Sequence, residues 1–163
     1  MKKLLFLIAM ILPSISFGQV LVSKFKLCKD EPFGNFPGRK GLETKFKVTS
    51  DKDLKYVKFH YYIVNNVGDV ISGLERGITE EGKEYIKPKV FSITGPMEPG
   101  KTYSPWVGAI LQTHQKVTAM PYQIEIVYMG SNESVFIDIN KDNINDYFPK
   151  LKWIEYNRWN KAL

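Results

Sequence analysis

The clearest alternation of apolar and polar residues along the chain lies between residues 54 and 73. Every second side chain at its centre is apolar or aromatic, which is typical of a strand with one buried and one available face. The buried set is predicted to be Val57, Phe59, Tyr61 and Ile63, and the available set Lys58, His60 and Tyr62. Asn and Gly at residues 65–69 favour a tight turn, after which Val70 begins a return. We therefore predict a hairpin whose first strand lies in the middle of a sheet.

Shorter alternating runs recur along the chain between Gly, Pro and Asn turns. They predict strands at residues 20–27, 43–49, 89–94, 101–111, 122–129 and 135–139. Phe46 is expected to face inward, Glu125 is expected to alternate outward, and Pro105 argues for an edge strand or a bulge. The charged segment 73–84 indicates a solvated connection. Because no helical period separates these runs, we predict an all-β, antiparallel β-sandwich of seven or eight strands, covering residues 19–148.

The end of the chain has a different pattern. Pro149 suits the first turn of a helix, and aromatic residues then recur at three-residue spacing: Trp153, Tyr156 and Trp159. This predicts a short C-terminal α-helix over residues 149–161, within a tail of residues 149–163. The helix either docks on the sandwich, which we favour, or presents its aromatic residues to a partner.

The N-terminus favours an exported protein. Lys2 and Lys3 precede an apolar run, and small residues at Ser16 and Gly18 suit cleavage before Gln19. The run is too short to span a bilayer, so residues 1–18 are predicted to be a cleaved signal peptide, with no transmembrane segment in the mature chain. The expected location is periplasmic or extracellular.

Composition narrows the function classes. The chain has 163 residues, a formal net charge of +6 and one cysteine. This length suits a single domain with a real core, and the dispersed positive charge is not the concentrated stripe that nucleic acid requires. Cys28 cannot form an internal disulfide, so it is either a small buried side chain or a free thiol.

Three segments carry a family resemblance. The aromatic strand and turn at Val57–Ser72, the Pro-Gly turn at Gly95–Lys101 and the strand and turn at Ile124–Ser131 together resemble the small secreted bacterial immunoglobulin-like domains called FxLYD. The resemblance covers about residues 50–139. It implies an immunoglobulin-like sandwich that acts as an accessory or binding module, with no catalytic residues to carry over.

The sequence offers little catalytic chemistry. Neither His60 nor His114 belongs to a nucleophile–base motif, and no zinc-binding spacing is present. The segment Asp138–Asp146 matches the start of a calcium loop, but Pro149 stands where a bidentate Glu is needed. We therefore predict no catalytic residues, no metal and no cofactor.

Binding is the remaining class of function. Candidate binding residues are aromatic side chains in the 30–41 loop, in the 101–111 strand and in the tail. They are Phe33, Phe36, Trp106, Trp153, Tyr156 and Trp159. The two phenylalanines of the loop either fold back as a lid on one end of the sandwich, which we favour, or form an exposed aromatic tip. The first hypothesis is a non-catalytic protein-interaction module with a partner at the cell envelope. The alternative is a carbohydrate-binding module that uses exposed Trp and Tyr rings on a glycan, and a small hydrolase is the third.

Overall fold

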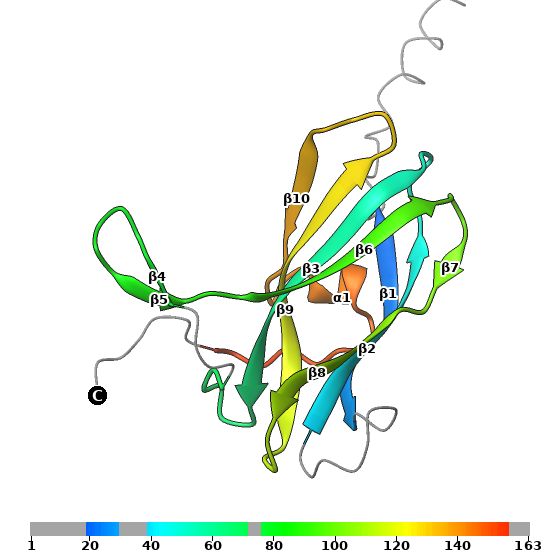
Figure 1. Ribbon diagram of the computed structural model, residues 1–163. Helices are drawn as coiled ribbons and strands as arrows, with labels where there is room; N and C mark the ends of the chain where they lie inside the picture. Colours follow the sequence, from blue (N-terminus) through cyan, green and yellow to red (C-terminus); the bar gives the residue numbers. More distant parts are fainter. Residues whose placement is uncertain (1–18, 30–38, 72–75, 157–163) are drawn as a thin grey trace, which may run out of the picture.

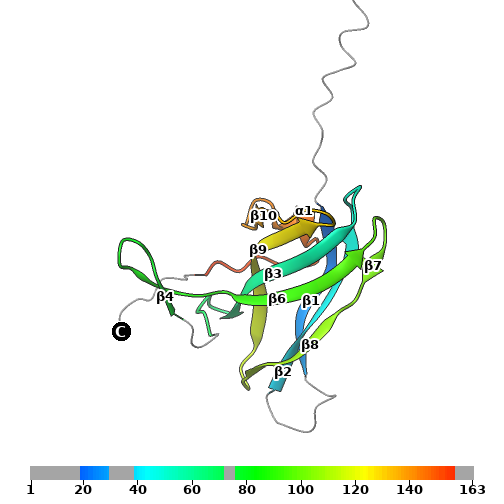
Figure 2. The same cartoon turned by 45° about the horizontal axis from the view of Figure 1, so that its top comes forward.

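The chain folds as a sandwich of antiparallel β-sheets in a computed structural model that describes residues 19–29, 39–71 and 76–156. In these ranges there are two four-stranded sheets, a two-stranded hairpin and one short helix (Figure 1). Figure 2 separates the two layers. The predicted all-β class is confirmed. No helix among the described residues is long and apolar enough to cross a membrane.

The first sheet, sheet A, contains β1, β2, β7 and β8, with β2 paired to the other three. Their bounds are β1 Val20–Lys29, β2 Arg39–Val48, β7 Thr102–Tyr103 and β8 Trp106–Gln112. The predicted strand at 101–111 is therefore divided at Pro105, whose carbonyl accepts a hydrogen bond from the Thr44 N–H at 3.1 Å. Proline has no N–H to continue a ladder, which explains the break.

The second sheet, sheet B, has the order β10-β9-β3-β6. Its strands are β3 Leu54–Asn65, β6 Lys89–Met97, β9 Val117–Tyr128 and β10 Ser134–Asp138. The prediction that the first strand of the 54–73 segment lies inside a sheet is confirmed, because β3 pairs with both β9 and β6. The predicted β9 strand begins earlier than expected and passes Pro121 at a register shift.

The predicted return after residue 69 begins as expected and is described as far as Ile71. The turn forms, with the Asn65 side-chain oxygen accepting the N–H groups of Val67 and Asp69. Beyond it the return pairs with the end of β3, through a bridge of Val64 with Val70 and a hydrogen bond from the Ile71 N–H to the Ile63 carbonyl at 2.7 Å. β6 occupies this edge of β3 from Leu54 to Tyr61, so the return pairs with the residues of β3 that follow.

The core lies between the two sheets and is rich in aromatic rings. The predicted inward set of β3 is confirmed, since Val57, Phe59, Tyr61 and Ile63 are at most 1% exposed. Phe25 from sheet A packs against Phe59, and Phe148 from the end of the chain contacts both rings. Burial raises the pKa of Tyr61 to about 12. Phe148, which lies far along the chain from Phe25 and Phe59, therefore completes the core of the sandwich.

The helix is shorter and earlier than predicted. It is α1, Ile144–Tyr147, and residues 149–156 have no helical structure. The backbone leaves the helical region at Phe148, whose ring is buried in the core. The aromatic spacing that indicates a helix instead lets Trp153 and Tyr156 pack on the sandwich. The rest of the predicted helix, residues 157–161, lies outside the described residues.

The charged connection after β3 contains a small hairpin, which we call the arm. It consists of β4, Arg76–Ile78, and β5, Glu84–Ile86, joined by an exposed turn. Figure 1 shows the arm projecting from the sandwich between β3 and β6. Its high charge agrees with the predicted exposure of this segment, although the pairing of β4 with β5 was not predicted.

Candidate functional site

The outward surface of sheet B, which we call the outer face, is organised by strand register. Residues paired across antiparallel strands project to the same side, so the pairing defines three rows. The rows, each from β10 to β6, are Ser134–Val127–Tyr56–Thr94, Phe136–Glu125–Lys58–Ser92 and Asp138–Gln123–His60–Val90.

Glu125 is the polar centre of this face. Its carboxylate accepts hydrogen bonds from Lys58 Nζ and Ser134 Oγ, each at 2.8 Å, and lies 3.3 Å from His60 Nε2. The Glu125 side chain points outward, as the alternation predicts, but it is only 8% exposed. Its neighbours on β3 and β10 cover it.

The charge of Glu125 is stabilised by those neighbours. Burial alone would raise the pKa of this carboxyl, but the hydrogen bonds from Lys58, Ser134 and His60 outweigh burial and hold the pKa below its usual value. The centre of the outer face is therefore a paired, ordered ion cluster.

Apolar side chains lie at both edges of the same face. Phe136 on β10 is 57% exposed, and Val90 on β6 is 52% exposed. Three strand spacings separate them, which places them roughly 15 Å apart. The outer face thus combines a neutralised centre with two exposed apolar flanks.

A pocket adjoins the row that contains His60 and Gln123. It lies between the outer face and the base of the arm and has a volume of about 460 Å³. The sandwich contributes His60, Tyr62, Tyr122 and Gln123, and the arm and its exit contribute Ile78, Thr79, Glu80, Tyr85 and Pro88. Pockets for small ligands fall in this size range. We call it the arm pocket.

Tyr62 does not occupy the available position that the alternation predicts. It is fully buried, with Tyr122 at 5.8 Å and Tyr156 at 5.1 Å between ring centroids. Trp153 in turn packs on Tyr156 with the rings tilted and their centroids 5.7 Å apart, and it donates its indole N–H to Glu155. The tail therefore covers this side of β3, and two predicted binding residues, Trp153 and Tyr156, take part in that packing.

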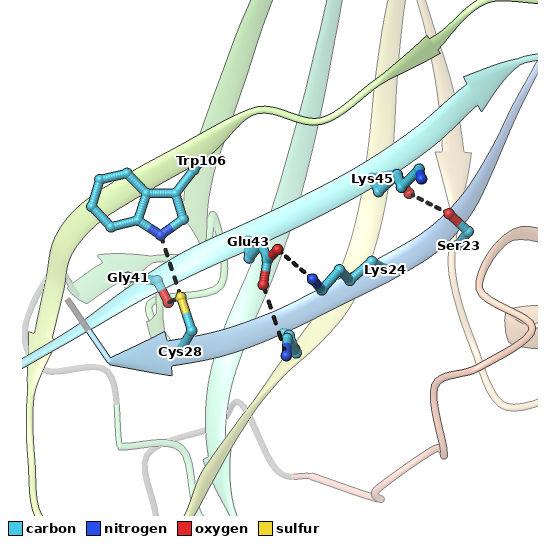
Figure 3. Close-up of polar contacts among 8 residues, drawn as sticks. Ser23, Lys24, Cys28, Gly41, Glu43, Lys45 and Trp106 are labelled. Atoms are coloured by element: carbon cyan, nitrogen blue, oxygen red, sulfur yellow. Dashed lines mark hydrogen bonds and ion pairs between the residues drawn. The ribbon is translucent and has the colours of Figure 1, made fainter. Parts of the chain in front are cut away.

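Trp106 lies on sheet A, away from the tail. Its indole N–H donates to the Cys28 sulfur at 3.3 Å, and the ring lies over Gly41 (Figure 3). A Cβ on Gly41 would come within 2.9 Å of the indole, so glycine is what allows the ring to lie there. The remaining predicted binding residues, Phe33, Phe36 and Trp159, lie outside the described residues.

The outward side of sheet A is basic. Lys24 and Lys26 both form ion pairs with Glu43, and Figure 3 labels the pair of Lys24 with Glu43. The hydrogen bond from Lys24 lowers the pKa of the Glu43 carboxyl. Lys45 and Lys47 on the same strand are exposed. This face is a solvated lysine surface.

The segment considered for calcium is closed by its own hydrogen bonds. The Asn140 side chain accepts the N–H groups of Asp142 and Asn143, and the Asn143 amide donates to the Asp138 carbonyl. Within the described part of the chain, no three His, Cys, Asp or Glu side chains gather as metal ligands would.

Comparison with protein-family models, with curated proteins and with solved structures finds no match for this chain. The resemblance to FxLYD domains stays a prediction. Function has to be argued from the surface alone.

Two features of the site were missed from the sequence, for different reasons. The ion cluster had a signal, because Lys58 and Glu125 are opposite charges on the outward parity of the two clearest strands. The arm pocket had no signal in the sequence. Tyr85 and Tyr122 line the same pocket only because the charged connection after β3 folds back beside the sandwich.

Proposed function

We propose that the chain is an exported, non-catalytic binding protein that engages a protein partner at the bacterial envelope through the outer face of sheet B. The observation that carries this proposal is the pair of exposed apolar side chains, Phe136 and Val90, on either side of the ordered Glu125 cluster. An apolar contact area with few free charges is what distinguishes the centre of an interface from ordinary surface.

The opposite sheet supports this choice by contrast. Lysine is depleted at protein interfaces, and sheet A presents Lys26, Lys45 and Lys47 to solvent. On the outer face of sheet B, Lys58 is already paired with Glu125. A partner that covers sheet B therefore desolvates fewer unpaired charges than one that covers sheet A.

The residue after the expected cleavage point belongs to the fold, which favours the export part of the proposal. The Gln19 carbonyl accepts hydrogen bonds from the N–H groups of Thr49 and Ser50, and the Gln19 side chain accepts one from the Tyr128 hydroxyl. Val20 is fully buried. Cleavage before Gln19 would leave these contacts in place.

Site-specific photocrosslinking in cells tests the partner proposal. A photoreactive phenylalanine analogue at position 136 should give one discrete crosslinked species, whereas the same analogue at Val67, which is 80% exposed on the β3 turn, should not. The substitution Phe136→Ser should weaken binding of the partner identified in this way by about tenfold or more. Equal crosslinking from both positions, or none from position 136, would contradict the proposal.

Export has its own measurement. N-terminal sequencing of the protein from fractionated cells should give Gln19 as the first residue of an envelope or secreted species. Recovery of the uncleaved chain in the cytoplasm would refute this part.

A further inference from the structure

We infer that the arm pocket binds a short neutral saccharide of one or two rings. This site goes beyond the proposed protein contact, and it shares only His60 and Gln123 with the outer face. The inference rests on the lining of the pocket, on the way its polar groups are held, and on its charge.

The lining offers both surfaces that a sugar requires. Tyr85 and Tyr122 are partly buried aromatic rings, and Ile78 and Pro88 add aliphatic surface. The C–H faces of a pyranose carry a small positive polarisation, and the face of an aromatic ring is negative, so the two attract when stacked. Hydroxyl groups then need polar partners around the rim of the ring.

Those polar partners are held in place by hydrogen bonds to neighbours. Gln123 donates its amide N–H to Asp138 at 2.6 Å, which directs the amide and leaves its oxygen as the acceptor for a ligand hydroxyl. His60 uses Nε2 toward Glu125, so Nδ1 is the nitrogen that can meet a ligand. Preorganised groups of this kind lose little entropy when a ligand binds.

The arm is also internally ordered. The Thr79 hydroxyl accepts the Lys83 N–H at 3.1 Å, and the Thr79 N–H donates to the Lys83 carbonyl at 2.9 Å. Tyr85 lies across Gly77, where a Cβ would come within 2.4 Å of its ring. Glycine at this position therefore allows the ring to lie close against the backbone of β4.

Charge decides between ligand classes. Among the side chains that the structure describes around the pocket, which exclude that of Arg76, there is one carboxylate, Glu80, and no lysine or arginine. An anionic ligand would find no cation among these residues, and a cationic one would find a single exposed carboxylate beside His60. A neutral polyhydroxyl ligand matches this balance, with Glu80 and Thr79 as further hydrogen-bond partners.

Titration of the purified protein by two-dimensional amide NMR tests the inference. Maltose, cellobiose and N,N′-diacetylchitobiose are added in turn to a final concentration of about 10 mM, which is enough to populate a site with a millimolar Kd. At least one should shift the side-chain amide of Gln123 and the backbone amides of Gly77 and Ile78. N-acetylarginine amide serves as a cationic competitor probe.

Variants then assign the contact. Tyr85→Ala should weaken binding by about tenfold, whereas Tyr85→Phe should weaken it by less than about threefold because the ring remains. Tyr56→Ala, a tyrosine on the same sheet but outside the pocket, should leave binding unchanged. Gln123→Ala should also weaken binding. Because Gln123 lies on strand β9 of the sandwich, this variant tests the site even if Tyr85→Ala disturbs the fold of the arm.

Absence of shifts with all three saccharides would overturn the inference, as would binding that survives both Tyr85→Ala and Gln123→Ala. Shifts with N-acetylarginine amide alone would replace the saccharide with a cationic side chain. Because these variants leave Phe136 untouched, failure here is distinguishable from failure of the protein-partner proposal.

Discussion

Replacement of Gly68 by alanine tests how the tail is held on the sandwich. Gly68 has a φ of 90° in the β3 turn, and a Cβ built on it would lie 2.2 Å from the backbone oxygen of Glu155. Gly130, in the turn between β9 and β10, has a φ of 77°, and a Cβ there would meet nothing within 4 Å. Gly130→Ala is therefore a matched control that carries the backbone strain without the clash.

The two variants should differ by the cost of moving the tail. Positive φ costs an L-residue roughly 1 kcal/mol, which applies to both alanines. At Gly68 the tail must also withdraw by more than an ångström, which disturbs the packing of Tyr156 on Tyr62 and of Trp153 on Tyr156. Losing contacts of this kind costs a further ~1–3 kcal/mol. We expect Gly68→Ala to lower the unfolding free energy by about 2–4 kcal/mol in total.

Two measurements check this expectation. Urea unfolding should show the smaller loss, about 1 kcal/mol, for Gly130→Ala and the larger one for Gly68→Ala. Trypsin cleavage after Lys150 and Lys152 should be faster in Gly68→Ala only, because undocking exposes the backbone on both sides of Leu151. Equal stability and equal cleavage rates in the two variants would show that residues 151–156 do not depend on this contact.

Three further predictions concern the ion clusters and the core. Glu125→Gln should lower the unfolding free energy by about 1–2 kcal/mol, and Glu43→Gln, which changes a more exposed cluster, by less than about 0.5 kcal/mol. Because the pKa of Glu125 is lowered in the folded state, the difference between the two variants should shrink as the pH falls through the carboxyl range. Equal losses for the two variants in urea unfolding would contradict this expectation. Because the pKa of Tyr61 is raised to about 12 in the folded state, its contribution to stability is complete below pH 10 and is lost as the pH rises toward 12. Between these pH values the unfolding free energy of the unsubstituted protein should fall by about 2–3 kcal/mol more than that of Tyr61→Phe, as measured by urea unfolding. Gly41→Ala should displace the indole of Trp106 and raise the reaction rate of the single thiol with a thiol reagent, and an unchanged rate would refute the packing described for that ring.

The parts of the fold that could be predicted depend on local alternation. Alternation in β3 identifies its inward residues from Val57 to Ile63, because this parity lies in the core of the sandwich over the middle of the strand. The outward parity is harder to predict, since Tyr62 is buried by Tyr156, which is remote in sequence. The tail was misassigned for a related reason. Three-residue spacing of aromatic rings is typical of a helix, but an extended segment packed on a sandwich can bury the same residues.

The candidate surface follows the same division. Lys58 and His60 could be placed on an outward face from the sequence, but their common partner Glu125 required the register of β3 with β9. Glu43 and Glu125 have the same local signature, an acid alternating outward on a strand. Pairing leaves the Glu43 side chain 34% exposed beside two lysines on sheet A, and it leaves the Glu125 side chain 10% exposed between Lys58 and His60 on sheet B.

Register, rather than composition, therefore separates a surface suited to solvent from one suited to a partner. A face that presents exposed lysines such as Lys45 and Lys47 is costly to desolvate, because an ammonium loses its water when a partner covers it. On the outer face of sheet B the central charges are paired with one another, and Phe136 and Val90 are exposed at the edges beside Ser92, Thr94 and Asp138. Covering the centre of this face would remove apolar area from water while its charges stay paired, which is the physical reason for our proposal that a partner lies on sheet B.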